Sequence, residues 1–183
     1  MAAADIKKVI MNGDEMRRAL KRISHQILEH IPDTDVLLLV GIKRRGVSIA
    51  QEIAENLRSI ERVEVPIHVL DITYYRDDLV KKSAQPVVMP AEFDVDGKKV
   101  ILVDDVLYTG RTARAAMDAI MDMGRPDAIR LAVLVDRGHR ELPIRADFVG
   151  KNVPTAKDEM ICVKVTAYDG EECVEISQAG GGA

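Results

Sequence analysis

The sequence contains few cysteines, few aromatic residues and no tryptophan. Its 183 residues include 2 Cys, 4 Tyr and 2 Phe. Cys162 and Cys173 are too few to form a disulfide framework in a chain of this length, which suggests reduced thiols in a reducing compartment. They form no Cys-x-x-Cys pair and no metal-binding spacing with the histidines. The scarcity of aromatic side chains would limit base stacking with any nucleic acid.

The sequence also lacks a strong net charge and a long hydrophobic run. Lys and Arg number 26 and Asp and Glu number 30, which gives a net charge of −4. The total charge therefore does not indicate a nucleic-acid partner, and RNA binding would require a local basic patch. No apolar run approaches the roughly 20 residues that span a bilayer, and the N-terminus has no signal-peptide pattern. We expect a cytoplasmic protein that binds no membrane.

The most informative stretch is residues 100–114. Val100–Val103 is a short apolar run that predicts a buried strand. Asp104 and Asp105 follow it, and the loop then ends at Thr109–Thr112, before apolar residues at helical spacing. In an open α/β sheet, ligands bind at the carboxyl ends of strands, where this loop is expected.

The chemistry of this stretch suits a sugar phosphate. A helix N-terminus that follows a Thr/Gly loop offers free backbone N–H groups to a phosphate. Two neighbouring carboxylates suit hydroxyl groups or hydrated Mg²⁺. Taken singly, each feature could instead be a turn or a helix cap. A second loop, Gly41–Val47, lacks the Gly-Lys-Ser/Thr ending of a nucleotide-binding P-loop.

Residues 100–112 resemble the 5-phosphoribosyl-1-pyrophosphate (PRPP) fingerprint of the type I phosphoribosyltransferases. Three further stretches, Asp71–Thr73, Tyr75–Leu79 and Leu131–Thr155, resemble one branch of this family. That branch consists of bacterial regulators that attenuate transcription of pyrimidine operons and also have uracil phosphoribosyltransferase activity. The resemblance extends from about Met11 to about Ile176.

The resemblance implies an α/β fold of the type I phosphoribosyltransferase kind. This fold has a central, mostly parallel sheet flanked by helices, a flexible loop and a small C-terminal hairpin region. We expect residues 1–178 to form one domain and residues 179–183 to form a disordered tail. Residues 75–90 are expected to be a mobile cover over the active site.

The sequence pattern predicts the individual elements. Residues 1–12 are expected to be a short lead-in. A helix should begin after Asn12 or Asp14 and end near His30, because apolar residues recur there every three or four positions. The other expected elements are strands at 36–40, 65–74, 100–103 and 129–135, a helix at 47–59, and a hairpin formed by 160–168 and 173–177.

The resemblance also implies roles for individual residues. Asp104 and Asp105 would hold the ribose hydroxyls and, with Arg45, would be the catalytic residues. Arg137 and Asp136 would bind uracil. Mg²⁺ would bind together with PRPP or pyrophosphate, with Asp136 as a further candidate ligand. The residues expected to bind PRPP are Lys43, Arg45, Gly46, Arg76, Asp104, Asp105, Val106, Leu107, Tyr108, Thr109, Gly110, Arg111 and Thr112.

One departure from the family pattern concerns Arg44, which occupies a position that usually holds a small hydroxyl residue. The loop Gly41–Gly46 is expected to bind the pyrophosphate, with an exposed basic turn as the alternative, and Arg44 leaves its detail open. Arg45 and Gly46 still match the family.

Basic residues gather on one stripe of the first predicted helix and after residue 139. The predicted RNA-binding residues are Arg18, Lys21, Arg22, His25, Arg140, Arg145 and Lys151. Like charges at helical spacing repel one another, so a stripe of residues that are all basic is unusual. This stripe begins at Arg17. The alternatives are a solvated face or a contact between subunits, because the resemblance implies a homodimer or a higher homo-oligomer.

Three functions are compatible with these observations. The first is a bifunctional protein that converts PRPP and uracil into UMP and pyrophosphate and binds a pyrimidine-leader mRNA stem-loop when UMP or UTP is abundant. The second is a plain pyrimidine or purine salvage phosphoribosyltransferase without RNA binding. The third is a non-catalytic RNA regulator. The intact 104–112 stretch disfavours the third function, and the 136–155 stretch disfavours the second.

Overall fold

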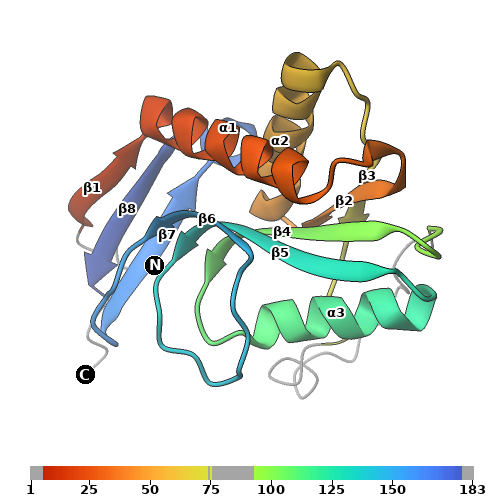
Figure 1. The fold of residues 1–183 in the computed structure, drawn as a ribbon. Coiled ribbons are helices and arrows are strands. Elements are labelled where there is room, and N and C mark those ends of the chain that lie inside the picture. The colour runs from red at the N-terminus through yellow and green to blue at the C-terminus, as the bar shows by residue number, and fades with distance from the viewer. Residues whose placement is uncertain (1–5, 74, 76–92, 179–183) are drawn as a thin grey trace.

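The computed structural model describes residues 6–73, 75 and 93–178, and its larger sheet has five strands (Figure 1). Every neighbouring pair in this sheet is parallel. In spatial order the strands are β3 (Ile67–Leu70), β2 (Leu37–Ile42), β4 (Lys99–Leu107), β5 (Ala128–Asp136) and β6 (Phe148–Asn152). The central strands are continuous apolar runs because both faces of the sheet are covered, and the predicted parallel sheet is confirmed.

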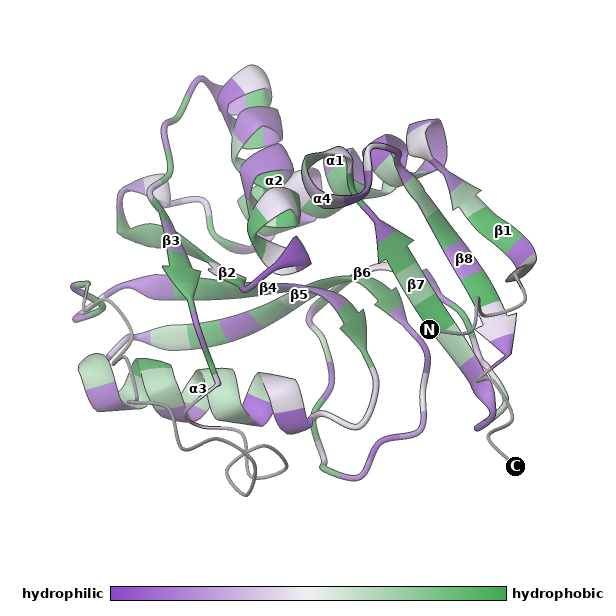
Figure 2. Ribbon diagram, turned by 180° about the vertical axis from the view of Figure 1, so that it is seen from behind, coloured by the Kyte–Doolittle hydropathy of each residue, from purple (hydrophilic) through white to green (hydrophobic). Residues whose placement is uncertain are grey.

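Helices cover both faces of this sheet. The helices α1 (Gly13–His30) and α2 (Arg45–Glu61) pack on one face, and α3 (Arg111–Met123) packs on the other (Figure 1). A 3₁₀ helix, Thr34–Val36, precedes β2. In Figure 2 the central strands are mainly hydrophobic, whereas α1 and α2 alternate between hydrophobic and hydrophilic residues. This pattern places the core between the sheet and one stripe of each helix.

The first helix forms as predicted. The Asn12 side chain accepts a hydrogen bond from the Glu15 backbone N–H, and the Glu15 carboxylate accepts one from the Asn12 N–H. This capping box satisfies two backbone donors at the helix start. The predicted apolar positions are all buried: Met16, Leu20, Ile23, Ile27 and Ile31.

The smaller sheet is antiparallel and contains β1 (Ile6–Asn12), β8 (Cys173–Gln178) and β7 (Glu159–Lys164) in that order. It confirms the predicted C-terminal hairpin, although β7 ends at Lys164 and a short helix, α4 (Thr166–Asp169), lies in the connection. The expectation of a lead-in over residues 1–12 is wrong, because β1 pairs with β8. Two register shifts in β1 break the alternation by which a strand is recognised.

Other boundaries differ from the predictions. The strand β4 continues through Asp104 and Asp105 to Leu107, so the carboxylates lie within the end of the strand rather than after it. The strand β3 is shorter than the predicted 65–74, and β6 was not predicted. Arg76, most of the predicted cover at 75–90 and the tail at 179–183 lie outside the described residues. None of the described helices has the length and apolar character needed to cross a membrane.

Candidate active site

Residues predicted to bind PRPP gather where the carboxyl ends of β2, β3 and β4 meet. They line a cavity of about 470 Å³ that combines cationic, anionic and hydroxyl groups. Its lining residues are Ile42, Lys43, Arg44, Arg45, Asp71, Ile72, Thr73, Asp104, Asp105, Val106 and Thr112. The parallel arrangement of the strands brings these distant segments to one edge of the sheet, as expected for an open α/β sheet.

A second cavity, of about 280 Å³, lies over the start of α3. Asp104, Val106 and Thr112 line both cavities, so the two adjoin at the end of β4. The remaining predicted loop residues from Leu107 to Arg111 also line this second cavity. An extended ligand can therefore reach from the helix N-terminus to the basic loop after β2.

The loop before α3 is held by a glycine turn and by contacts with the segment after β5. Gly110 precedes the helix with a φ of +92°, a conformation that favours glycine. The backbone N–H groups of Glu141 and Leu142 donate to the Thr109 carbonyl at 2.9 and 3.1 Å. Arg111 Nε donates to a Glu141 carboxylate oxygen at 2.7 Å. The segment after β5 thus fixes the loop that is predicted to bind a phosphate.

Gly46 packs closely against the sheet. A Cβ at this position would lie 2.4 Å from the Val103 carbonyl oxygen. The absence of a side chain therefore allows the first turn of α2 to pack directly on β4. Gly46 places Arg45 beside the cavity by this packing.

Lys43 is paired with Asp71 at the end of β3. Its Nζ lies 3.0 Å from Asp71 Oδ2, while the Thr73 hydroxyl donates to Asp71 Oδ1 at 2.6 Å. The hydrogen bond from the Thr73 side chain, supported by Lys43, lowers the pKa of Asp71 from 3.8 to about 2. Asp71 is therefore ionised at neutral pH and holds the Lys43 ammonium at the mouth of the cavity.

The residues predicted to bind uracil line a third cavity, of about 550 Å³, together with Thr155. The Arg137 guanidinium is buried, lies 4.0 Å from the centroid of the Tyr108 ring and donates to Thr155 Oγ1 at 3.1 Å and to the Glu159 carbonyl at 2.5 Å. These contacts hold the Arg137 side chain in place beside the cavity.

Both carboxylate oxygens of Asp136 have protein partners. Oδ1 accepts a hydrogen bond from the Gly138 N–H at 3.0 Å, and Oδ2 is bound by the Arg140 guanidinium. A metal ion at Asp136 would have to compete with Arg140, so this donor set fits Mg²⁺ poorly. Asp104 and Asp105, which line the first cavity, fit a hydrated cation better.

The structure divides the predicted RNA-binding residues between two faces. Arg18, Lys21, Arg22 and His25 are exposed on α1. Arg22 donates to the Gly150 carbonyl, and Lys151 Nζ donates to the Ile10 carbonyl at 2.9 Å, so Lys151 joins this group through β6 and β1.

Arg140 and Arg145 lie apart from this group. They belong to the segment between β5 and β6, whose Ile144 packs in the core cluster under α3, on the opposite face from α1 (Figure 1). The two sets of basic residues therefore lie on different elements, and their combination into one RNA-binding surface stays a prediction. Arg17, which begins the stripe, is paired with Asp14 at 2.5 Å and with Glu172.

Comparison with known proteins agrees with this geometry. The phosphoribosyl transferase domain family matches residues 8–169. The bifunctional protein PyrR of Thermus aquaticus is 58% identical over 177 residues, which cover 96% of this chain and 98% of the relative. The bifunctional protein PyrR of Caldicellulosiruptor bescii is 57% identical and covers 93% of this chain and 95% of the relative. The chain belongs to the PyrR family. This result confirms the resemblance seen in the sequence.

Solved structures outside the PyrR family share its fold. The hypoxanthine phosphoribosyltransferase of Trypanosoma cruzi superposes with a TM-score of 0.76 at 18% identity, and covers 94% of this chain and 96% of that chain. A hypoxanthine phosphoribosyltransferase from Staphylococcus aureus gives a TM-score of 0.73 at 17% identity, with coverage of 95% and 94%. At this identity the likeness shows the type I phosphoribosyltransferase fold alone.

Sequence reasoning missed several groups in this PyrR-family site. Asp169 binds Arg45 through a carboxylate contributed by the smaller sheet. Glu141 fixes Arg111, and Thr155 fixes Arg137. Each is far in sequence from its partner. Glu141 and Thr155 lie within the 131–155 stretch that resembles the family, but this stretch does not indicate which residue each one contacts. For Asp169 and Glu141 the charge opposite to that of an arginine is a further signal, and such charges are too common to identify a contact.

Proposed function

We propose that the chain transfers a phosphoribosyl group from PRPP to uracil, which yields UMP and pyrophosphate, and that it also binds pyrimidine-leader mRNA to promote transcription attenuation. The observation that carries this proposal is the 54–58% identity, over 93–96% of the chain, to proteins named bifunctional protein PyrR. The geometry of the adjoining cavities supports the transferase part, because it provides separate places for a phosphate, a ribose and a pyrophosphate.

In this proposal the ligand lies along the end of β4. Backbone N–H groups at Thr109–Thr112 and the α3 N-terminus receive the 5-phosphate. Asp104 and Asp105 hold the ribose hydroxyls and favour the positive charge that develops at the ribose carbon. Lys43 and Arg45 receive the pyrophosphate as its negative charge increases. The contribution of Arg76 is a further part of the proposal.

Mg²⁺ would bind with PRPP beside the carboxylates of Asp104 and Asp105, where it would neutralise charge on the leaving pyrophosphate. Uracil would occupy the cavity after β5. We assign the contacts with the base to the backbone of the 137–140 loop, because the Arg137 guanidinium is held by Thr155 and Glu159.

The RNA-binding surface is assigned to the exposed basic face of α1 together with Lys151. Because aromatic residues make up only 3% of the chain, contacts with phosphates should dominate, and binding should weaken steeply as salt increases. Cytoplasmic location and a homo-oligomeric state complete the proposal. Association of two copies could bring Arg140 or Arg145 of one copy beside α1 of another.

The experiment that tests this function has two measurements on the purified protein. One follows formation of UMP from PRPP and uracil in the presence of Mg²⁺. The other measures binding to a pyrimidine-leader stem-loop across a salt series, with and without UMP. Transfer together with binding that UMP strengthens supports both functions. If UMP forms but the stem-loop binds no more tightly than a scrambled RNA, the protein is a salvage enzyme. If the stem-loop binds but no UMP forms, the protein is a non-catalytic regulator.

A further inference from the structure

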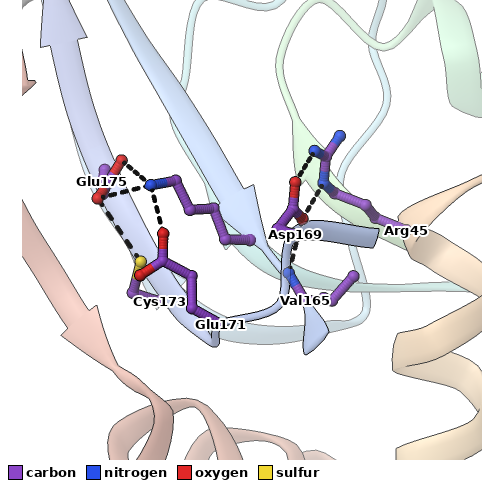
Figure 3. Close-up of polar contacts among 7 residues, drawn as sticks. Arg45, Val165, Asp169, Glu171, Cys173 and Glu175 are labelled. Carbon is purple, nitrogen blue, oxygen red and sulfur yellow. Dashed lines mark hydrogen bonds and ion pairs between the residues drawn. The ribbon is translucent and has the colours of Figure 1, made fainter. Parts of the chain in front are cut away.

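Asp169 lies on the connection between two strands of the smaller sheet, yet its carboxylate binds Arg45 at the start of α2 (Figure 3). Arg45 Nη2 donates to Oδ1 at 2.9 Å, and Nε donates to Oδ2 at 3.3 Å. This two-point contact uses one edge of the planar guanidinium and fixes its orientation. It joins the basic loop after β2 to a different sheet of the molecule.

Asp169 is itself held firmly. The Val165 backbone N–H donates to Asp169 Oδ2 at 2.9 Å, and the Asp169 N–H donates to the Val165 carbonyl at 2.8 Å. The side chain is only 20% exposed. The hydrogen bond from Arg45 lowers the pKa of Asp169 from its ordinary value, so the carboxylate is ionised at neutral pH. The Asp169 carboxylate is therefore held in one position, unlike a carboxylate on a mobile surface side chain.

The contact with Asp169 leaves the outer edge of the Arg45 guanidinium available. Within residues 6–73, 75 and 93–178, Nη1 makes no hydrogen bond. Arg45 lines the same cavity as Asp104 and Asp105. A guanidinium edge with free N–H donors matches the oxygens of a phosphate group.

We propose that Asp169 is a positioning residue for the pyrophosphate end of PRPP, because it holds one edge of Arg45 and leaves the other edge to the phosphate oxygens. The inference rests on the proposed phosphoribosyl transfer. An arginine that is already held loses less side-chain freedom when the anion binds. The connection within the smaller sheet thereby contributes to a site whose other groups lie at the ends of the larger sheet's strands and in the helices that follow them.

The decisive variant is Asp169→Asn. Its side-chain oxygen can still accept the hydrogen bond from Val165, but the charge that holds Arg45 is lost. The Kd for magnesium pyrophosphate, measured by isothermal titration calorimetry, and the KM for PRPP should both rise about tenfold. This factor is the lower end of the range expected when a group that orients a ligand-binding residue is lost. The kcat should fall as well, because Arg45 binds the pyrophosphate more strongly as its negative charge increases during transfer.

Three further variants separate positioning from a role in folding. Glu171→Gln removes the same charge from the same connection but pairs with Lys164, so it should leave the Kd and the KM unchanged. Asp169→Glu keeps the charge and should retain more affinity than Asp169→Asn. In an Arg45→Met background, Asp169→Asn should have no additional effect, because it acts only through Arg45.

The outcomes distinguish this inference from the proposed function. If the unaltered protein forms no UMP, the proposed function fails. If it is active and Asp169→Asn binds pyrophosphate as tightly as the unaltered protein, the positioning role is overturned. An equal loss of affinity in the Arg45→Met background would overturn it as well, because Asp169 would then act on the fold. Thermal unfolding of each variant verifies that the compared proteins are folded.

Discussion

At the scale of single residues, the site depends on groups whose orientation is fixed by their immediate neighbours. Asp105 accepts a hydrogen bond from the Val106 N–H at 2.8 Å, which directs its carboxylate within the cavity that also holds Arg45. Asp71 is fixed by Thr73 and Lys43. These contacts explain why short polar side chains at strand ends can present ordered charges to a ligand.

The first prediction concerns Asp105→Asn. The asparagine oxygen can still accept the Val106 N–H, but the negative charge that favours a cationic ribose carbon is lost. We expect kcat for UMP formation to fall about 100-fold with little change in stability. The matched control is Asp118→Asn, which removes a carboxylate paired with Arg114 on α3 and should keep normal activity. Equal activity of the two variants would remove Asp105 from the mechanism.

The second prediction concerns the pH dependence of stability at Asp71. The folded-state pKa of about 2 is below the ordinary value of 3.8, so the ionised group stabilises the folded protein above about pH 4. That contribution is lost as the pH falls from about 4 to about 2. Asp71→Asn should therefore lower the free energy of unfolding at neutral pH by less than about 1 kcal/mol, because the side chain is 40% exposed.

Urea denaturation at a series of pH values measures this difference. The curves for the unaltered protein and the variant should converge towards pH 2. A constant difference across the series would contradict the assigned cause.

At the scale of elements, the first helix shows how local signals and packing act together. Its capping box and its apolar stripe are both readable in the sequence, and both are present in the structure. The strand β1 shows the opposite case. Its pairing with β8 joins segments from the two ends of the chain, and its register shifts hide the alternation. Short-range patterns therefore identify α1 but cannot identify β1.

The third prediction concerns this helix start. Asn12→Ala removes the acceptor for the Glu15 N–H and should lower the free energy of unfolding by about 1 kcal/mol. Chemical denaturation measures the change. Glu29→Ala, an exposed position of α1 outside the cap, should have a much smaller effect. A similar loss in both variants would mean that the cap adds nothing beyond ordinary helix propensity.

At the scale of the whole molecule, the proposed RNA surface and the transferase site lie on different parts of the fold. The α1 face is separated from the 109–112 loop by the larger sheet, with α3 on the far side (Figure 1). Arg22 and Lys151 also tie α1, β6 and β1 together through backbone carbonyls. Alanine at these two positions would change packing as well as charge.

The fourth prediction therefore uses Arg18→Ala combined with Lys21→Ala, since both side chains are exposed and make no hydrogen bond within the described ranges. RNA affinity should fall about tenfold or more, and the salt dependence should become less steep, while UMP formation stays near normal. A filter-binding series in increasing salt measures both effects. Equal loss of RNA binding and transfer would contradict separate sites.

The sequence by itself determined the central strands of the parallel sheet, the amphipathic first helix and the loop at the end of β4, because each depends on short-range periodicity or on adjacent residue types. It also placed the chain in its family through residues 71–73 and 131–155, together with the loop. The tertiary structure alone decided that Arg137 is held internally, that the basic residues occupy two faces and that Asp169 reaches Arg45. Contacts of this kind depend on how distant strands pack, and no local pattern encodes that arrangement.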